Sequence, residues 1–220
     1  MNEHEWNDFI LPYELAMEGF MLKLESMRKQ YDSKGMYNPI EIITGRIKTY
    51  RSTIEKAQHL GINIEDIKDR VDDIAGIRVI CKYISDVYKV YDLLVARKDL
   101  TILTVKDYIK EPKDSGYQSL HIIALYHVET IEGSKPIRIE FQIRTHAMHL
   151  WASIEHELKY KYKRNVPVSV AEKLLEASKV SQELDKEMLK IRDAVEAQEE
   201  LEDLEAPQGS HDYGLSPLVH

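Results

Sequence analysis

Several features are scarce in this 220-residue sequence, and each scarcity excludes a class of protein. The single cysteine, Cys81, excludes an internal disulfide framework and fits a reducing compartment. No apolar run approaches the length of a membrane span, and the opening residues MNEHEWNDF do not form a signal-peptide pattern. We therefore predict a cytoplasmic protein with no membrane partner.

Glycine-rich phosphate loops are also missing. The nine glycines form neither GxGxxG nor GxxxxGK, so no Rossmann fingerprint and no P-loop is visible. A net charge of −8 argues against a general DNA-binding protein. Much of the acid lies near the C-terminus, however, and basic clusters occupy the middle of the chain. A small, phosphate-rich ligand is therefore compatible with the overall negative charge.

Hydrophobic residues make up 43% of the chain, which is enough for the core of one domain, with or without a helical appendage. Apolar residues at helical spacing predict a long helix over residues 3–31. A second helix is predicted to begin at Pro39, because proline fits a first helical turn. Its expected apolar stripe is Ile40, Ile43, Ile47 and Ile54.

A third long helix is predicted beyond Pro167. Its apolar positions follow alternating steps of three and four residues between Leu174 and Val195, on an otherwise charged sequence. This near-heptad spacing predicts a seam against another helix, from this chain or from another subunit.

Strand patterns dominate the middle of the chain. The apolar run from Ile77 predicts a buried strand, followed by a helix capped by Ser85 and a strand over about residues 100–109. Residues 119–128 and 137–144 are predicted to form an antiparallel hairpin, and Thr145 is predicted to cap the next helix.

The second strand of that hairpin alternates strictly. Four apolar residues point one way and four polar residues point the other, namely Ile137, Ile139, Phe141 and Ile143 against Arg138, Glu140, Gln142 and Arg144. The polar face is either ordinary solvated surface or the floor of a site for a charged ligand, and this stretch alone leaves both interpretations open.

Two acids are candidate metal ligands: Asp73, at the entrance to one strand, and Glu140, on the polar face of another. If the strands are neighbours, both carboxylates can bind one Mg²⁺. Water and substrate phosphates would then complete the coordination shell of the ion. Cations that could neutralise phosphate oxygens during transfer are Arg46, Lys48, Arg78, Lys106 and Lys113. Tyr117 offers a flat ring on which a base could stack. His146 and His149, three residues apart, make zinc the weaker alternative.

Several segments, in this order and spacing, resemble the small alarmone synthetases, the single-domain (p)ppGpp synthetases of the RelA/SpoT superfamily. They are TGRIK (44–48), DDIAGIRVIC (72–81), ARKDL (96–100), KDYI…PKDSGYQSLH (106–121), EFQIRT (140–145) and WASIEHELKYK (151–161). The resemblance implies an α+β fold, with a mixed β-sheet flanked by helices, related to the nucleotidyltransferase fold and carrying long N- and C-terminal helices. It implies a synthetase domain over residues 1–200, including oligomerisation helices, and an acidic, poorly ordered tail over 201–220.

The resemblance implies transfer of the β,γ-pyrophosphate of ATP to the 3′-OH of GDP or GTP, which yields ppGpp or pppGpp and AMP in the stringent response. Asp73 and Glu140 match the Mg²⁺ ligands, and Glu140 also matches the base that takes the 3′-OH proton. Arg46 and Arg78 match the arginines that sandwich the adenine of ATP. Lys48 matches a contact to the donor phosphates.

On the acceptor side, Tyr117 matches the tyrosine that stacks on guanine. The resemblance places Lys106, Lys113 and His121 along the acceptor pocket, and Gln142, on the face of Glu140, beside the metal or a phosphate. Gln118 stands where many small members have arginine, which leaves the preference among GDP, GTP and GMP open. Arg138 and Arg144 receive no role.

The resemblance also implies a homotetramer and leaves two further ligands open: single-stranded RNA, and (p)ppGpp as an allosteric activator. Two other functions compete with synthesis. One is a non-catalytic nucleotide- or RNA-binding regulator on the same fold, and the other is an enzyme that pyrophosphorylates an RNA 3′ end.

Overall fold

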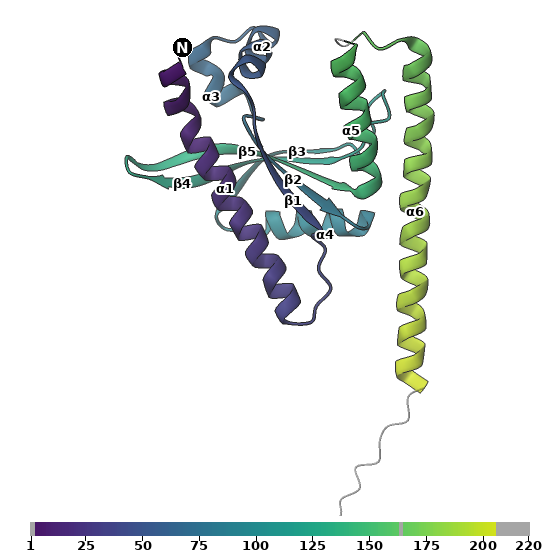
Figure 1. The fold of residues 1–220 in the computed structure, drawn as a ribbon. Coiled ribbons are helices and arrows are strands. Elements are labelled where there is room, and N and C mark those ends of the chain that lie inside the picture. Colours follow the sequence, from purple (N-terminus) through teal and green to yellow (C-terminus); the bar gives the residue numbers. More distant parts are fainter. Residues whose placement is uncertain (1–2, 163–164, 206–220) are drawn as a thin grey trace, which may run out of the picture.

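The computed structural model of the protein describes residues 3–162 and 165–205 (Figure 1). Helix α1 (Glu3–Ser33) is followed by β1 (Ile42–Ile47), α2 (Tyr50–Leu60), the 3-10 turn η1 (Ile64–Asp66), α3 (Ile67–Arg70), β2 (Ala75–Cys81) and α4 (Ile84–Val95). Strands β3 (Leu100–Asp107), β4 (Leu120–Thr130) and β5 (Gly133–Thr145) then precede α5 (His146–Lys161) and α6 (Val168–Glu205). None of the helices in these ranges is long and apolar enough to cross a membrane.

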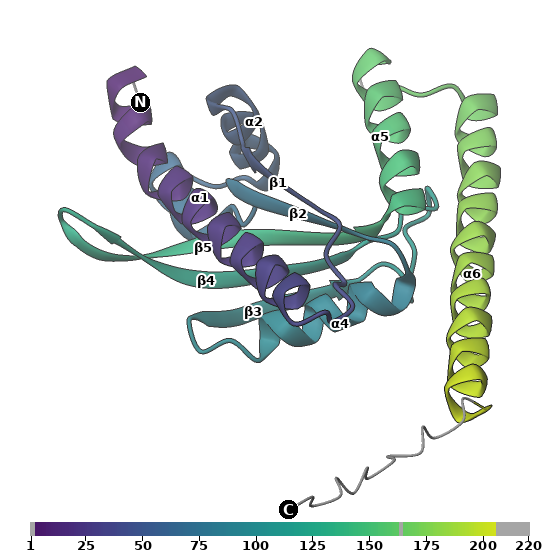
Figure 2. The same cartoon turned by 60° about the horizontal axis from the view of Figure 1, so that its bottom comes forward.

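The strands form one five-stranded sheet in the order β1-β2-β5-β4-β3. Strand β2 runs parallel to β5, while the β1–β2, β4–β5 and β3–β4 pairs are antiparallel. Long helices lie against and beside this sheet (Figure 2). The predicted mixed sheet, α+β class and β4–β5 hairpin are therefore confirmed. The predicted neighbourhood of the strands near Asp73 and Glu140 is confirmed as well, because β2 pairs directly with β5.

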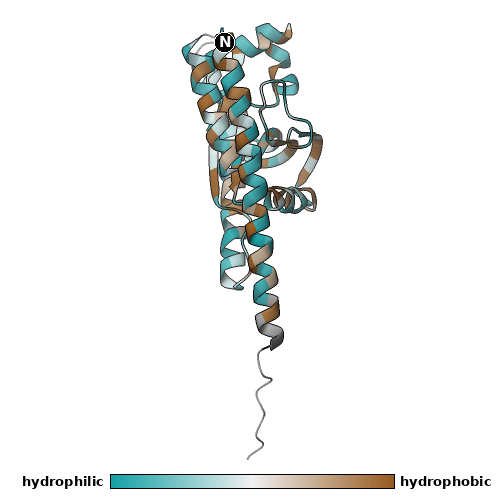
Figure 3. Cartoon of the chain, turned by 90° about the vertical axis from the view of Figure 1, so that its right-hand side faces the viewer, coloured by the Kyte–Doolittle hydropathy of each residue, from teal (hydrophilic) through white to brown (hydrophobic). Residues whose placement is uncertain are grey.

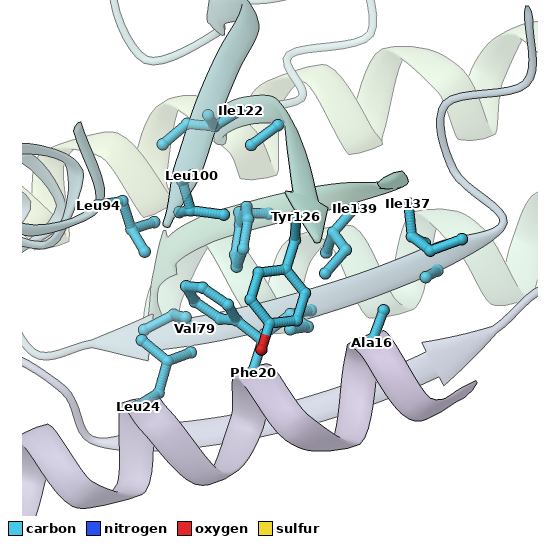
Figure 4. Close-up of a cluster of buried hydrophobic side chains, with 14 of the residues drawn as sticks. Ala16, Phe20, Leu24, Val79, Leu94, Leu100, Ile122, Tyr126, Ile137 and Ile139 are labelled. Carbon is cyan, nitrogen blue, oxygen red and sulfur yellow. The ribbon is translucent and has the colours of Figure 1, made fainter. Parts of the chain in front are cut away.

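The alternation in β5 assigns its two faces as predicted. Ile139, Phe141 and Ile143 are fully buried, and α1 and α4 cover their face of the sheet. Phe20 of α1 packs edge-on against Phe141, with ring centroids 4.9 Å apart, in the apolar cluster of Figure 4. Burying one such phenylalanine contributes about 1.5–3 kcal/mol. This core holds β5 rigidly, so its opposite face is a stable platform for polar side chains.

Gly45 explains how closely α1 approaches β1. A Cβ atom at position 45 would lie 2.5 Å from Sδ of Met21 and 2.7 Å from Sδ of Met17. Any larger residue would force the flexible side chains of Met17 and Met21 to move. The glycine therefore leaves room for these two methionine side chains between α1 and β1, the strand that carries Arg46.

Two local predictions are wrong. The helix predicted to begin at Pro39 is strand β1 over its first part, and helix α2 starts only at Tyr50 after the N-cap Thr49. The β-branched residues 42–44 favour a strand, Gly45 disfavours a helix, and pairing with β2 decides the outcome. Ser85 is not a helix cap: α4 begins at Ile84, and the Ser85 hydroxyl instead accepts a hydrogen bond from Arg192.

The predicted terminal helices are confirmed as α1 and α6. Helix α1 passes through Pro12 without interruption. Helix α6 runs on to Glu205, so the predicted boundary at residue 200 falls inside a helix, and the rest of the predicted tail, 206–220, lies outside the described residues.

Helix α6 contacts its own domain through an unusual face. The buried residues of this face are polar, Ser178 and Asp185, whereas the apolar stripe of the helix is exposed. Leu184, Met188, Ile191 and Val195 expose between 41% and 55% of their surface. Apolar residues recur along α6 in the side view of Figure 3. Among the described residues, the predicted seam is therefore open from Leu184 to Val195, whereas Leu174 at its start is partly buried against Tyr117 and Trp151.

Candidate active site

A cavity of about 660 Å³ lies on the polar face of the sheet, beside α5. All of the predicted site residues except Lys48 line it: Arg46, Asp73, Arg78, Lys106, Lys113, Tyr117, His121, Glu140 and Gln142. Residues from five strands, one loop and a turn thus meet in one place.

Strand register explains this convergence. One row across the sheet places Lys106 opposite His121, His121 opposite Gln142, and Gln142 opposite Arg78. The next row places Glu140 opposite Gly76, and Gly76 opposite Arg46. Side chains alternate along each strand, so residues in these rows share one face. Of the two interpretations of the polar face, the floor of a site is the one that the structure supports.

The carboxylate of Asp73 holds two ammonium groups. Nζ of Lys48 lies 2.8 Å from Oδ2, and Nζ of Lys56 lies 2.7 Å from Oδ1. Burial raises the pKa of the Asp73 carboxyl, but the hydrogen bonds from Lys48 and Lys56 outweigh burial and hold this pKa below its ordinary value. Asp73 is therefore ionised at neutral pH, and Lys48 reaches the site through it.

Glu140 is the second ionised acid. Its Oε1 lies 3.0 Å from Nδ1 of His121, and its Oε2 accepts a hydrogen bond of 2.8 Å from Nε2 of Gln142. Burial and the nearby Asp73 raise the pKa of Glu140. The hydrogen bonds from His121 and Gln142 lower this pKa by a larger amount, so the net shift is downward. The two carboxylates are therefore close enough to sense each other's charge.

This pair of carboxylates fits Mg²⁺. The ion needs only one or two carboxylates when substrate phosphates and water complete its shell. Each oxygen of Asp73 and Glu140 has one hydrogen-bonded partner here, and each retains a lone pair for a cation. The described residues contain no cluster of three or more His, Cys, Asp or Glu suited to a metal, which leaves His146 and His149 without the further ligands that zinc requires.

Tyr117 is held more tightly than a free stacking platform. It is 9% exposed, its hydroxyl lies 2.8 Å from Nε2 of His121, and Nη2 of Arg144 donates to the same oxygen. Nζ of Lys113 lies 4.8 Å from the ring centroid, and Cζ of Arg144 lies 5.1 Å from it. A base that stacks on this ring must therefore compete with the ammonium of Lys113.

A closed ring of hydrogen bonds joins these groups. It runs from Glu140 to His121, Tyr117, Arg144 and Gln142, and the amide of Gln142 returns to Glu140. Every member is at least half-buried, so each bond is stronger than it would be in water. The ring fixes the orientation of Glu140 before any ligand arrives.

The two unassigned arginines separate clearly. Arg144 is 5% exposed and belongs to the ring. Arg138 lies elsewhere on β5, and its Nη1 is 2.7 Å from Oδ1 of Asp72, so it stabilises the turn that presents Asp73. Gln118 does not line the cavity; its amide donates to the carbonyl of Ile109 and braces the loop before β4.

The sequence does not predict several of the cavity's residues. Lys56 of α2, Tyr108, Ser115 and Arg144 contribute to it, and α5 contributes Ala152, Ser153, Glu155, His156 and Lys159. The α5 residues recur at helical spacing, a signal that the sequence contains. Lys56 carries no such signal, because only the packing of α2 brings it to Asp73. Burial lowers the pKa of Lys113, and the nearby Lys159 lowers it further.

Comparison with known proteins agrees with this geometry. Residues 45–165 match the family model described as the region found in RelA / SpoT proteins. The chain is 42% identical to GTP pyrophosphokinase YjbM from Bacillus subtilis (strain 168), over 89% of this chain and 92% of that protein.

Two solved structures are similarly close. Small alarmone synthetase 1 from Bacillus subtilis bound to its product pppGpp superposes with a TM-score of 0.85, at 42% identity, over 88% of this chain and 99% of that one. The same synthetase bound to AMPCPP superposes with a TM-score of 0.79, at 38% identity, over 89% of this chain and 100% of that one. Because a family model matches more than half of the chain and the similarity to YjbM covers nearly all of both proteins, the chain belongs to the RelA/SpoT family.

Proposed function

We propose that this protein is a GTP pyrophosphokinase. It transfers the β,γ-pyrophosphate of ATP to the 3′-OH of GTP or GDP and releases AMP with pppGpp or ppGpp. The observation that carries the proposal is one cavity in which two ionised carboxylates, Asp73 and Glu140, lie among several cations. The family membership and the similarity to a GTP pyrophosphokinase and to a structure bound to pppGpp support it.

On the donor side, Arg46 and Arg78 bind the adenine of ATP between their guanidinium planes. Arg78 lines the cavity, and its buried Nε, which has no hydrogen-bond partner among the described residues, is in addition available to donate to an acceptor atom of the ligand. Lys48 and Lys56 lie at Asp73, where they bind the donor phosphates and neutralise their charge. The similar structure bound to AMPCPP, an adenine nucleotide, supports a donor of this class.

On the acceptor side, Tyr117 stacks on guanine, and Lys106 and Lys113 bind the 5′-phosphates. Glu140 takes the proton of the 3′-OH as the 3′-oxygen attacks the β-phosphorus. A new bond forms between that oxygen and the β-phosphorus, the bond to the oxygen shared with the α-phosphate breaks, and AMP leaves with that oxygen. His121 and Gln142 hold Glu140 in line for the transfer.

Asp73 and Glu140 would hold Mg²⁺, which supplies charge neutralisation at the phosphates when bound. The protein's own cations act in the same sense. Besides Arg144, which belongs to the hydrogen-bonded ring, seven cations line the cavity or contact Asp73: Arg46, Lys48, Lys56, Arg78, Lys106, Lys113 and Lys159. Positioned charges of this kind provide most of the catalysis of phosphoryl transfer.

We further propose a cytoplasmic homotetramer. The exposed stripe of Leu184, Met188, Ile191 and Val195 supports assembly, because a helix buries such a stripe against a partner. Sedimentation is expected to give four times the chain mass of 25.7 kDa. Met188→Glu is expected to dissociate the assembly, while Lys179→Glu, at an exposed position of the same helix, leaves it intact.

The decisive experiment incubates the protein with Mg²⁺, labelled ATP and one acceptor at a time: GDP, GTP, GMP or tRNA. Labelled product with GDP or GTP, and AMP in equal amount, is the expected result. Product only with tRNA would replace the assignment with pyrophosphorylation of an RNA 3′ end. Binding without any product would favour a regulator. Repeating the GTP assay with added pppGpp, or with single-stranded RNA, tests whether either acts as an allosteric ligand.

A further inference from the structure

The loop that carries Lys113 and Tyr117 rests directly on α6. Gly116 adopts φ +87°, and a Cβ atom placed there would lie 2.6 Å from Cβ of Ser178, closer still to its Oγ, and 3.2 Å from Cδ1 of Leu175. Contacts this short mean that backbone and helix touch with no space between them. Ser178 is 3% exposed and its hydroxyl donates to the carbonyl of Leu175, so its orientation is fixed.

The same loop is internally tight. The amide of Gly116 donates to the carbonyl of Lys113 at 2.7 Å, and the amide of Lys113 donates to the carbonyl of Tyr117 at 3.2 Å. Lys113, Gly116 and Tyr117 therefore move as one unit. A displacement of Gly116 by its neighbour on α6 is transmitted to both side chains that face the cavity.

Helix α6 reaches Tyr117 by two further routes. Nε1 of Trp151 donates to the carbonyl of Leu174 at 2.8 Å, and Trp151 packs behind the ring of Tyr117, with centroids 6.4 Å apart. The hydroxyl of Thr145 donates to Oδ2 of the buried Asp185 at 2.7 Å. Thr145 directly follows Arg144, whose guanidinium holds the Tyr117 hydroxyl.

We propose that α6 is the positioning element for the acceptor side of the cavity, and that Ser178 is its main positioning residue. The helix touches the loop before Tyr117, the tryptophan behind it and the residue beyond Arg144, and it lines no part of the cavity itself. It acts through Gly116, Trp151 and Thr145 rather than by contact with a ligand. Naming the ligand as the guanine nucleotide rests on the proposed function.

A two-residue cycle tests the contact. Gly116→Ala places a methyl group against Ser178, and the double variant Gly116→Ala/Ser178→Gly removes the two nearest atoms that it meets. The backbone strain of alanine at positive φ is present in both, and the single variant Ser178→Gly measures the separate cost of glycine in α6, so the three variants together isolate the contact. Gly116→Ala is expected to raise the KM for GTP about tenfold, as overpacking does, with the KM for ATP unchanged. The double variant is expected to recover most of that loss.

Matched controls separate positioning from general stability. Lys179→Gly introduces the same helix-weakening residue at the exposed neighbouring position and is expected to leave both KM values unchanged. If Gly116→Ala does not fold, Ser178→Thr adds one methyl group to the same contact, and a smaller rise in the KM for GTP alone is expected. Equal rises in both KM values, or no recovery in the double variant, would overturn the proposal.

Hydrogen–deuterium exchange of residues 110–118 provides a readout that needs no activity. Faster exchange in Gly116→Ala and restored protection in Gly116→Ala/Ser178→Gly are expected. If the wild-type protein makes no alarmone but this exchange pattern holds, the proposed function fails and the positioning role stands. If the enzyme is active and exchange is the same in all variants, the positioning role fails alone.

Discussion

The two walls of the cavity are built on different principles. The wall from β1, β2 and α2 presents cations around the single acid Asp73, and Arg78 lies there with a buried Nε that has no partner in the described ranges. The wall from β4, β5 and the loop before β4 contains the closed ring of hydrogen bonds through Glu140, His121 and Tyr117, and α5 lies beside it. On the first wall the Nε of Arg78 has no partner among the described residues, while on the second wall the ring residues already bond to one another.

This difference predicts different binding costs. Burial lowers the pKa of Arg78, and the neighbouring Arg144 guanidinium adds to that effect, so an aromatic or anionic ligand relieves an unfavourable site. A ligand at Tyr117 must instead displace the ammonium of Lys113, but it meets a ring that is already oriented. Preorganisation reduces the entropy lost on binding. The first wall therefore gains from new contacts, and the second from rigidity.

The largest expected effect comes from the acids where the two walls meet. Asp73→Asn and Glu140→Gln are each expected to lower turnover by at least ~10²-fold, because charge stabilisation around the transferred phosphates is lost. Steady-state assays measure this, and thermal melting checks that both variants fold. Glu129→Gln, at an exposed acid near the far end of β4 that does not line the cavity, is the control with a small expected effect. Near-normal turnover in both acid variants would mean that the cavity is not the catalytic centre.

Tyr117 tests the preorganised wall alone. Tyr117→Leu is expected to weaken acceptor binding by about 1–3 kcal/mol, the range for loss of a stacked base, with the KM for ATP unchanged. Calorimetric titration with GTP and with a non-hydrolysable ATP analogue measures the two affinities separately. Tyr160→Leu, at a tyrosine that is 83% exposed, serves as control. Weaker ATP binding instead would reverse the assignment of the two walls.

Asp185 of α6, which accepts a hydrogen bond from Thr145 behind the second wall, is expected to lower the stability of the folded protein at neutral pH. Burial raises the pKa of this carboxyl to about 6, although the bond from Thr145 opposes the shift. Between about pH 4 and pH 6 the folded state retains a proton that the unfolded chain has lost, so the free energy of unfolding falls as pH rises through that window and stays low above it.

Asp185→Asn removes this titration while an amide oxygen can still accept from Thr145. We expect the variant to be more stable than wild type by roughly 1–2 kcal/mol at pH 8, allowing for relaxation around the site, and equally stable below about pH 4. Urea titrations at several pH values measure the difference. A constant difference across pH would show that Asp185 does not titrate in this window.

Arg78 tests the open wall and carries the smallest expected effect. Arg78→Gln is expected to raise the KM for ATP about two- to fivefold, which corresponds to a cation–π contact of ~0.5–1 kcal/mol, without changing the KM for GTP. Arg51→Gln, at an exposed arginine that pairs with Glu55, is its control. Equal changes for both nucleotides would erase the distinction between the walls.

The sequence predicts the fold correctly in regions where the local residue pattern and the tertiary environment favour the same structure. The alternation from Ile137 to Arg144 predicts both faces of β5, and Thr145 caps α5 through the amide of Met148 as predicted. Residues 39–47 show the opposite case, because their isoleucine spacing suits a helix and a strand alike. The β-branched residues 42–44 lean toward a strand, but it is the pairing of β1 with β2 that decided the outcome.

The candidate site divides in the same way. Resemblance to a known family selects Asp73, Glu140 and the residues around them one by one, and the sequence alone determined their chemical types and order. Only the tertiary structure decided that Lys56 reaches Asp73, that Arg144 closes a ring around Tyr117, and that polar residues of α6 hold the loop at Gly116. The physical reason is distance along the chain. Periodicity reports which face a residue occupies within its own element, whereas these contacts join residues on different elements and depend on how the whole sheet and its helices pack.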